Sequence, residues 1–237
     1  MDKTPLHLPL VRWAADLAFT DLDTKTVEHT KALLLDALAC IAAGSSVAGV
    51  GECVGAMKIL GGAKQSKVLG FDFKTSADKA AFFNGTMGHA RDYDDTHDVS
   101  VIHSCAVIVP ALLSMANSSL SSEGISGKAF LTSLAAGIHV TNRIGLAFGL
   151  YLDTGWMPTT LFGPFGCVVG CGKLLGFTEK QMLNGFGIAY SYIGGNRKAL
   201  VEGGFMKRIQ PGIASSHGVE STLLALKGIT GPKHVFE

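Results

Sequence analysis

The spacing of the apolar residues limits the fold of this chain more than any other feature of its sequence. Between residues 8 and 19, apolar side chains such as Leu8, Val11 and Ala15 stand three or four positions apart. Side chains at this spacing lie on one face of an α-helix. The same period predicts helices over residues 8–19, 24–43, 48–60, 77–91, 104–117, 126–148, 159–175, 179–191 and 212–227.

Strand patterns are almost absent. The run 67–70 could form an isolated strand, and no hairpin or repeated strand pattern is visible. Many short apolar helices pack most simply against one another around a shared core. We therefore expect a mainly α fold, a compact multi-helix domain that extends over residues 1–237.

Polar residues stand where several of these helices should begin. Thr24 or Thr26, Ser76 and Thr178 each precede an apolar, periodic stretch and are typical N-cap residues. The glycine-rich stretch 194–204 is the clearest irregular segment.

Charge and composition exclude several classes of partner. Charged residues make up 16% of the chain, and the net charge is +1, with no long basic or acidic block. Neither nucleic acid nor an anionic membrane is therefore expected as a partner. The most apolar stretches, 101–116 and 161–177, are interrupted by His103, Pro110 and Lys173 and fall short of the ~20 apolar residues that a spanning helix needs. We expect a soluble, cytoplasmic protein.

The cysteines indicate a reducing compartment. There are five, at positions 40, 53, 105, 167 and 171, in apolar surroundings and without a C-x-x-C pair. An odd number without such pairs argues against a disulfide framework. Cys167 and Cys171 share a helix face among glycine, valine and leucine, so we expect buried apolar groups rather than metal ligands.

The residues that could carry chemistry gather in one segment. The run HARDYDDTH, from His89 to His97, holds three aspartates, two histidines and a threonine, and His103 follows it closely. If the helix expected over 77–91 continues, His89, Asp92 and Thr96 share one of its faces. A helix end followed by a helix start would then surround one concave spot with ionisable groups.

Three interpretations of this segment are open. Its aspartates and Thr96 could cap helix ends beside solvated histidines. Its histidines and aspartates could hold a divalent metal, although no H-E-x-x-H motif fixes a geometry. The interpretation that we favour is metal-free acid–base catalysis, because so many ionisable groups rarely gather without a function.

The same segment resembles a signature of the MmgE/PrpD family, which reads H-A-L-D-F-D-D-T-H, then H-P-S and P-A. This chain has HARDYDDTH, then His103-Ser104 and Pro110-Ala111. The family includes 2-methylcitrate dehydratase, cis-aconitate decarboxylase and iminodisuccinate epimerase. Further matching blocks follow in the right order over nearly the whole chain: Gly155 to Thr160, Gly163 to Gly166, Lys207 to Gly212 and Thr230 to Pro232.

The resemblance implies a helical main domain, a smaller α+β lid domain, a homodimer, and no metal or organic cofactor. A chain of 237 residues that matches the main domain has no segment left for the lid. We therefore expect residues 1–237 to form a main domain without its lid, either truncated or as a natural half-length form.

Carried over residue by residue, the resemblance implies that Asp92, His103 and Lys207 are catalytic. His103 would carry the proton, since an unperturbed imidazole has a pKa of about 6.5. Asp92 would orient His103 or act as a base itself, and Lys207 would neutralise substrate carboxylates. The candidate substrate-binding residues are Thr96, His97, Met157 and Arg208.

Met157 is a departure from the family pattern. The family commonly has histidine between the Trp156 and Pro158 positions, and a thioether can neither carry a proton nor donate a hydrogen bond. A second acid–base group is therefore missing from this chain.

These observations favour a cofactor-independent lyase or isomerase that acts on a small di- or tricarboxylate. Acid–base chemistry beside a carboxylate would support dehydration, decarboxylation or epimerisation. Two alternatives are a non-catalytic dimerisation or ligand-binding module and a metal-dependent hydrolase built on the His/Asp cluster.

Overall fold

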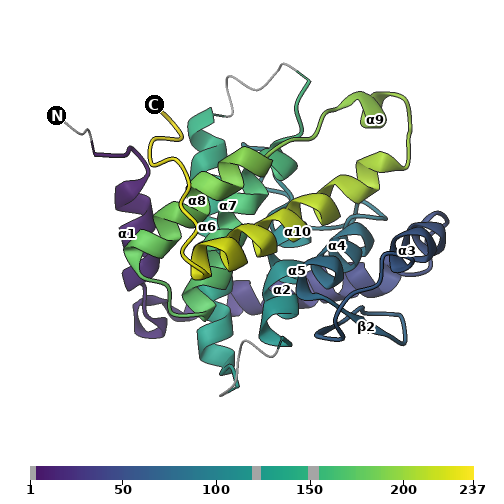
Figure 1. The fold of residues 1–237 in the computed structure, drawn as a ribbon, viewed down its shortest axis with the longest axis horizontal. Helices are drawn as coiled ribbons and strands as arrows, with labels where there is room; N and C mark the ends of the chain where they lie inside the picture. The colour runs from purple at the N-terminus through teal and green to yellow at the C-terminus, as the bar shows by residue number, and fades with distance from the viewer. Residues whose placement is uncertain (1–3, 119–123, 149–154) are drawn as a thin grey trace.

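The computed structural model describes residues 4–118, 124–148 and 155–237, and the described chain is mainly helical (Figure 1). The prediction of a mainly α, multi-helix fold is confirmed. The elements are α1 (Leu8–Asp16), η1 (Phe19–Asp21), α2 (Thr24–Gly44), α3 (Val50–Lys58), β1 (Ser66–Lys67), β2 (Lys74–Thr75), α4 (Ala77–Gly88), α5 (Ser104–Ala116), α6 (Gly127–Phe148), α7 (Pro158–Leu174), α8 (Glu179–Tyr192), α9 (Lys198–Val201) and α10 (Met206–Leu226).

Helices α5 and α7 form the centre of the core. Every residue from Ser104 to Leu112 in α5 and from Thr159 to Gly172 in α7 is buried. A helix that is apolar all around can be stable only when other elements cover it. Helices α4, α6 and α10 supply this cover. The central position of α5 and α7 explains why the stretches 101–116 and 161–177 are so apolar. Among the described residues, no helix is long and apolar enough to cross a bilayer.

Glycines allow the helices around the site to approach closely. A Cβ on Gly212 of α10 would lie 2.3 Å from the carbonyl oxygen of Phe82 in α4. A Cβ on Gly137 of α6 would lie 2.8 Å from the carbonyl oxygen of Gly166 in α7. Only glycine permits backbones to pack at these distances. The α4–α10 contact brings the first turn of α10 close to the segment that follows α4.

Two of the differences between predicted and observed helix boundaries move site residues. Helix α4 ends at Gly88, so His89, Asp92 and Thr96 do not share a helix face as expected. Helix α10 begins at Met206 rather than at 212 and contains Pro211. The predicted start at residue 212 was therefore wrong. Helices α5 and α7 also contain an internal proline.

Smaller elements also differ from expectation. Ser66-Lys67 and Lys74-Thr75 form a short antiparallel pair, where only an isolated strand was predicted. The glycine-rich stretch 194–204 contains the short helix α9. Asp23, not Thr24 or Thr26, caps α2, since its carboxylate accepts from the backbone N–H of Thr26. Thr178 caps α8 as predicted.

Candidate functional site

The candidate site forms where four segments meet. The loop after α4 carries residues 89–97, His103 is the N-cap of α5, and Lys207 lies in the first turn of α10. The N-terminal turn of α7 holds this arrangement in place, because Thr159 Oγ1 accepts from the backbone N–H of His103 at 3.0 Å. Segments more than a hundred residues apart are thereby brought together.

A buried carboxylate, Asp94, joins the two histidines of the cluster. Its Oδ2 lies 2.9 Å from Nδ1 of His89 and 3.2 Å from Nδ1 of His103. The Asp94 side chain is 2% exposed and that of His89 is 1% exposed, so water does not compete for these contacts. Both imidazoles can donate from Nδ1 to one carboxylate, which fixes their tautomers and orientations.

The far nitrogens of the two rings have different environments. The rings of His89 and His103 pack edge to face, with their centroids 4.8 Å apart. Nε2 of His89 is buried without a hydrogen bond and lies 3.6 Å from Oδ1 of Asp92. The His103 side chain is 18% exposed. His103 is therefore the imidazole that a ligand in solution can reach.

Asp92 and Lys207, which were expected to line one site in separate roles, form an ion pair. The ammonium of Lys207 lies 2.5 Å from Oδ1 of Asp92. Asp92 adopts a φ of 60°, a left-handed conformation that aspartate tolerates better than most residues. This conformation turns the chain sharply after α4. The Lys207 side chain is 13% exposed, so its charge lies at the edge of the protein interior.

The ionisation of the cluster is set by these contacts. Burial would raise the pKa of Asp94, but hydrogen bonds from His103 and His89 and their positive charge outweigh it and hold this pKa well below its usual value. Burial would lower the pKa of His103, but the hydrogen bond and the charge of Asp94 raise it above its usual value. For Asp92, the hydrogen bond and charge of Lys207 outweigh burial and lower the pKa. Asp92 and Asp94 are therefore carboxylates near neutral pH, and Asp94 favours the charged form of His103.

Asp95 has a different role from its neighbours. Its Oδ1 accepts from the backbone N–H of Cys105 at 2.9 Å, in the first turn of α5, so the capping interpretation holds for this residue. Burial raises the pKa of Asp95 to about 6, against the lowering effect of this hydrogen bond, and the nearby charge of Asp94 raises it further.

The raised pKa predicts that Asp95→Asn stabilises the protein above pH 6. Between its usual pKa of 3.8 and about 6, the folded state holds the Asp95 proton more tightly than the unfolded state, so stability is lost as the pH rises through this window. Asparagine keeps an acceptor for Cys105 without the charge, and the gain should be about 2 kcal/mol at pH 8 and near zero at pH 3.5. Urea unfolding at both pH values measures it. An equal gain at both would contradict the electrostatic cause.

A cavity of about 180 Å³ adjoins the ion pair. It is bounded by the end of α4, the α9 segment and the start of α10, and its lining is His89, Asp92, Ala199, Leu200, Gly203, Gly204, Lys207 and Arg208. Pockets for drug-sized ligands measure roughly 300–1,000 Å³, so this cavity suits a small acid.

The four candidate substrate-binding residues lie in different places. Arg208 lines this cavity, and its guanidinium lies over the ring of Phe205. Thr96 Oγ1 lies 3.4 Å from Nδ1 of His103, within the cluster. His97 does not line the cavity beside Lys207, and its Nδ1 lies 2.8 Å from the Ser100 hydroxyl.

Met157 occupies the N-cap of α7 and is buried. Its backbone N–H donates to the Gly195 carbonyl. Thr159, two residues later, accepts a hydrogen bond from the backbone N–H of His103. Met157 does not line the cavity beside Lys207. The backbone at position 157 is thus close to the site, although the thioether of Met157 makes no polar contact with the described residues of the site.

Sequence reasoning undervalued two residues. Neither His89 nor Asp94 was among the predicted catalytic or substrate-binding residues, yet Asp94 contacts both imidazoles. The available signal was the spacing itself, with Asp94 five residues after His89 and nine before His103. A regular helix would not bring positions 89, 94 and 103 together. The tight turns that follow α4 bring them into contact.

The cluster also contains a potential metal-ligand set. One ligand atom from each of His89, Asp92, Asp94 and His103 lies within 4.8 Å of the others. Nδ1 of each imidazole already contacts Asp94, and the Lys207 ammonium contacts Asp92. A dication held by this set would lie beside Lys207 and be repelled by it. The donor set as arranged therefore fits a network of internal ion pairs better than a metal site.

Comparison with known proteins places this geometry in a wider context. A family model described as the MmgE/PrpD N-terminal domain matches residues 9–237. The chain is 31% identical over 246 residues to the cis-aconitate decarboxylase-like protein oryM of Aspergillus oryzae, which covers 100% of this chain and 50% of that protein. It is 31% identical over 239 residues to a cis-aconitate decarboxylase of Aspergillus terreus, covering 99% of this chain and 48% of the relative. Identity to the human cis-aconitate decarboxylase is 26% over 220 residues, covering 91% of this chain and 45% of the relative. The chain thus spans about half the length of the curated relatives it matches.

Proposed function

The chain belongs to the MmgE/PrpD family, and from this premise we propose that it carries the acid–base site of a lyase for a small tricarboxylate, with decarboxylation of cis-aconitate as the favoured reaction. The observation that carries the proposal is the arrangement of Asp94, His103, Asp92 and Lys207. Asp94 holds the ring of His103, a ring nitrogen of His103 lies within 4.8 Å of the Asp92 carboxylate, and that carboxylate holds Lys207, although His103 itself does not line the cavity beside Lys207.

The proposed reaction needs one proton and one stabilised negative charge. One C–CO₂ bond breaks, CO₂ leaves, and the electron pair remains in the unsaturated acid. The imidazolium of His103 then gives its proton to a carbon of that acid, and solvent restores the proton. The raised pKa of His103 favours the imidazolium form that this step uses. The reaction consumes one proton per CO₂, so it is balanced.

The cations would hold the substrate during this step. Lys207 has three N–H donors, of which Asp92 takes one, so the others can bind a substrate carboxylate. Arg208 borders the same cavity and would bind a second carboxylate. Thr96 would hydrogen-bond the substrate or hold His103. The proposed site uses no cofactor, and a homodimer, a cytoplasmic location and residues 1–237 as a main domain without its lid remain predictions.

Direct turnover tests the proposal. The purified chain is incubated with cis-aconitate, and itaconate is followed by proton NMR with and without a chelator. We expect turnover that chelation does not reduce and that Lys207→Met lowers by about 100-fold in kcat/KM. Lys227→Met, at the other end of α10, is the matched control and should leave the rate unchanged. Absence of turnover, or turnover that chelation abolishes, would refute a metal-free lyase.

Met157→His tests whether this N-cap position belongs to the site. An imidazole here would restore a second proton carrier, and we expect kcat to rise about 10-fold or more. Met57→His, on α3, is the control because it places the same change on a half-buried methionine of another helix. Equal rates for both variants and the unchanged protein, with unfolding midpoints preserved, would show that position 157 lies outside the site.

A further inference from the structure

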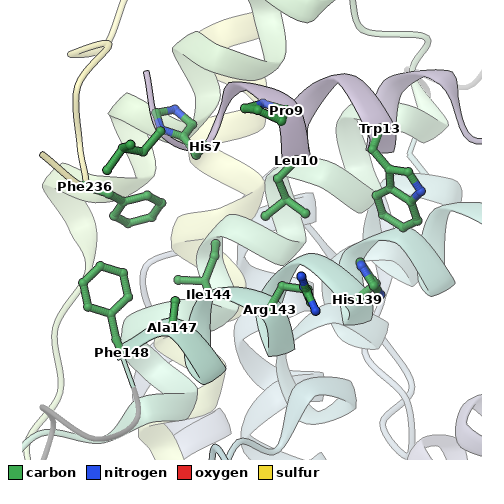
Figure 2. A pocket seen from close by; sticks show the side chains of 11 residues that line it. His7, Pro9, Leu10, Trp13, His139, Arg143, Ile144, Ala147, Phe148 and Phe236 are labelled. Carbon is green, nitrogen blue, oxygen red and sulfur yellow. The ribbon is translucent and has the colours of Figure 1, made fainter. Parts of the chain in front are cut away.

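A second cavity lies on the opposite side of the core from α3, between α1 and α6. Figure 2 shows it from close by, with α1 above and α6 below. Its volume is about 510 Å³, which falls in the range typical of small-molecule sites. Asp92, His103 and Lys207 do not line it, so it is separate from the candidate lyase site.

The walls of this α1–α6 cavity are largely apolar and aromatic. Leu10 of α1 faces Ile144 of α6, and Phe148 and Phe236 close one end (Figure 2). The rings at this end support one another, since the Phe148 and Phe236 centroids lie 5.5 Å apart. His7 stacks on Phe186 at 5.2 Å and presents a further ring to the cavity. Such stacked rings make a firm wall for an apolar ligand.

One permanent positive charge, that of the exposed residue Arg143, borders this apolar cavity. Arg143 of α6 lines the cavity and has no ion-pair or hydrogen-bond partner among the described residues. No acidic residue is among the eleven that line the cavity. His139, one turn away and 4.4 Å from the Trp13 ring, has a pKa lowered by burial and by the charge of Arg143, so it is neutral near pH 7.

We propose that this cavity binds an amphipathic monocarboxylate, with the carboxylate on Arg143 and an alkyl or aryl body between Leu10 and Ile144. Arg143 offers a planar pair of donors that matches a carboxylate. Burial of the body supplies the larger part of the affinity, at about 25 cal/mol per Å² of apolar surface. A polycarboxylate such as cis-aconitate lacks that body, so the two sites would not compete for one ligand.

The charge distribution decides between this ligand and other occupants. A neutral lipid would gain nothing from the exposed Arg143 guanidinium, whereas a carboxylate adds a charge-assisted hydrogen-bonding pair at the border of the cavity. An amine would be repelled by Arg143. A second copy of the chain would have to bring an acidic residue on an apolar segment into the cavity, whereas a fatty or aromatic acid carries both features in one small molecule.

Binding of decanoate tests the proposal. Trp13 lines the cavity, whereas Trp156 lies beside the start of α7, so ligand binding should change the Trp13 fluorescence. Decanoate is titrated at submicellar concentration, and calorimetry measures the dissociation constant and the stoichiometry. We expect one saturable site that binds decanoate at least about 10-fold more tightly than decanol, as expected for one charged hydrogen-bonding pair.

Variants locate the carboxylate. Arg143→Gln should weaken decanoate binding by about 10-fold or more and leave decanol binding unchanged, and Arg143→Lys should retain an intermediate affinity. Lys128→Gln removes a charge from the other end of α6 and should have no effect. Leu10→Asp should abolish binding of both ligands.

Two results would overturn the proposal. One is equal binding of decanoate by the unchanged protein and by Arg143→Gln. The other is a concentration-dependent dimer in sedimentation experiments that Leu10→Asp dissociates and that excludes decanoate, because a second copy would then fill the cavity. Neither result depends on turnover of cis-aconitate, so failure of the lyase proposal would be seen separately.

Discussion

Replacement of His103 by glutamine is expected to lower kcat/KM for cis-aconitate by about 10²- to 10⁴-fold, the usual contribution of a positioned general acid. Glutamine fills a similar volume and can still hydrogen-bond Asp94, but it cannot transfer a proton. The backbone N–H of residue 103, which donates to Thr159, is unchanged by the substitution. The fold should therefore survive, and the loss should appear in kcat rather than in KM.

The control for this variant is His29→Gln, an exposed histidine on α2. It should keep the full rate, so that a loss at position 103 is not explained by histidine removal in general. Steady-state kinetics and far-UV circular dichroism on both variants make the comparison. A His103→Gln protein that is folded and retains more than a tenth of the rate would remove His103 from the proposed mechanism.

Asp94→Asn is expected to reduce both stability and activity. An amide carries no charge to pair with the imidazolium of His103, and its nitrogen would replace one of the two carboxylate oxygens that Nδ1 of His89 contacts. Breaking a buried charged pair on one side typically costs about 3–5 kcal/mol. Because the exposed face of His103 relieves part of this cost, we expect about 3 kcal/mol at pH 6. Activity should fall with it, since Asp94 orients the proton carrier.

The pH dependence of this loss follows from the two pKa shifts. Asp94 has a lowered pKa, so its contribution is present above its usual value of 3.8 and disappears as the pH falls through the folded-state pKa. His103 has a raised pKa, so its contribution is present below its usual value of 6.5 and disappears as the pH rises through the folded-state pKa. The stability difference should therefore be largest between about pH 4 and 6.5.

The catalytic profile gives an independent measurement. In the unchanged protein, the rate should fall as the pH rises through the raised pKa of His103. Without the Asp94 charge, burial is left as the main influence and this pKa should drop, so the fall in rate should move to lower pH. Asp98→Asn, an exposed aspartate four residues away, is the matched control and should shift neither curve. An unshifted rate profile in Asp94→Asn would show that Asp94 does not set the ionisation of His103.

The site was predicted from sequence to an uneven degree. The family resemblance implied that Asp92 and Lys207, 115 positions apart, line one site, and the structure brings the two side chains into contact. The route to it was wrong, because an extended helix was expected to present Asp92, and a left-handed turn presents it instead. A helix can be read from the period of its apolar residues. A turn of this kind depends on contacts of its polar side chains with distant segments.

The sequence by itself determined that this chain is helical, that its central helices are the least charged ones, and where its chemistry is concentrated. Local spacing and composition are enough for these conclusions, since each depends on residues within a few turns of one another. Only the tertiary structure decided that Asp94 joins His89 to His103, that Asp95 caps α5, and that Arg143, without an ion-pair partner in the described part of the chain, borders an apolar cavity. These features depend on which helices pack together and how closely, and glycine contacts such as that of Gly212 with α4 fix this at distances that no local pattern encodes.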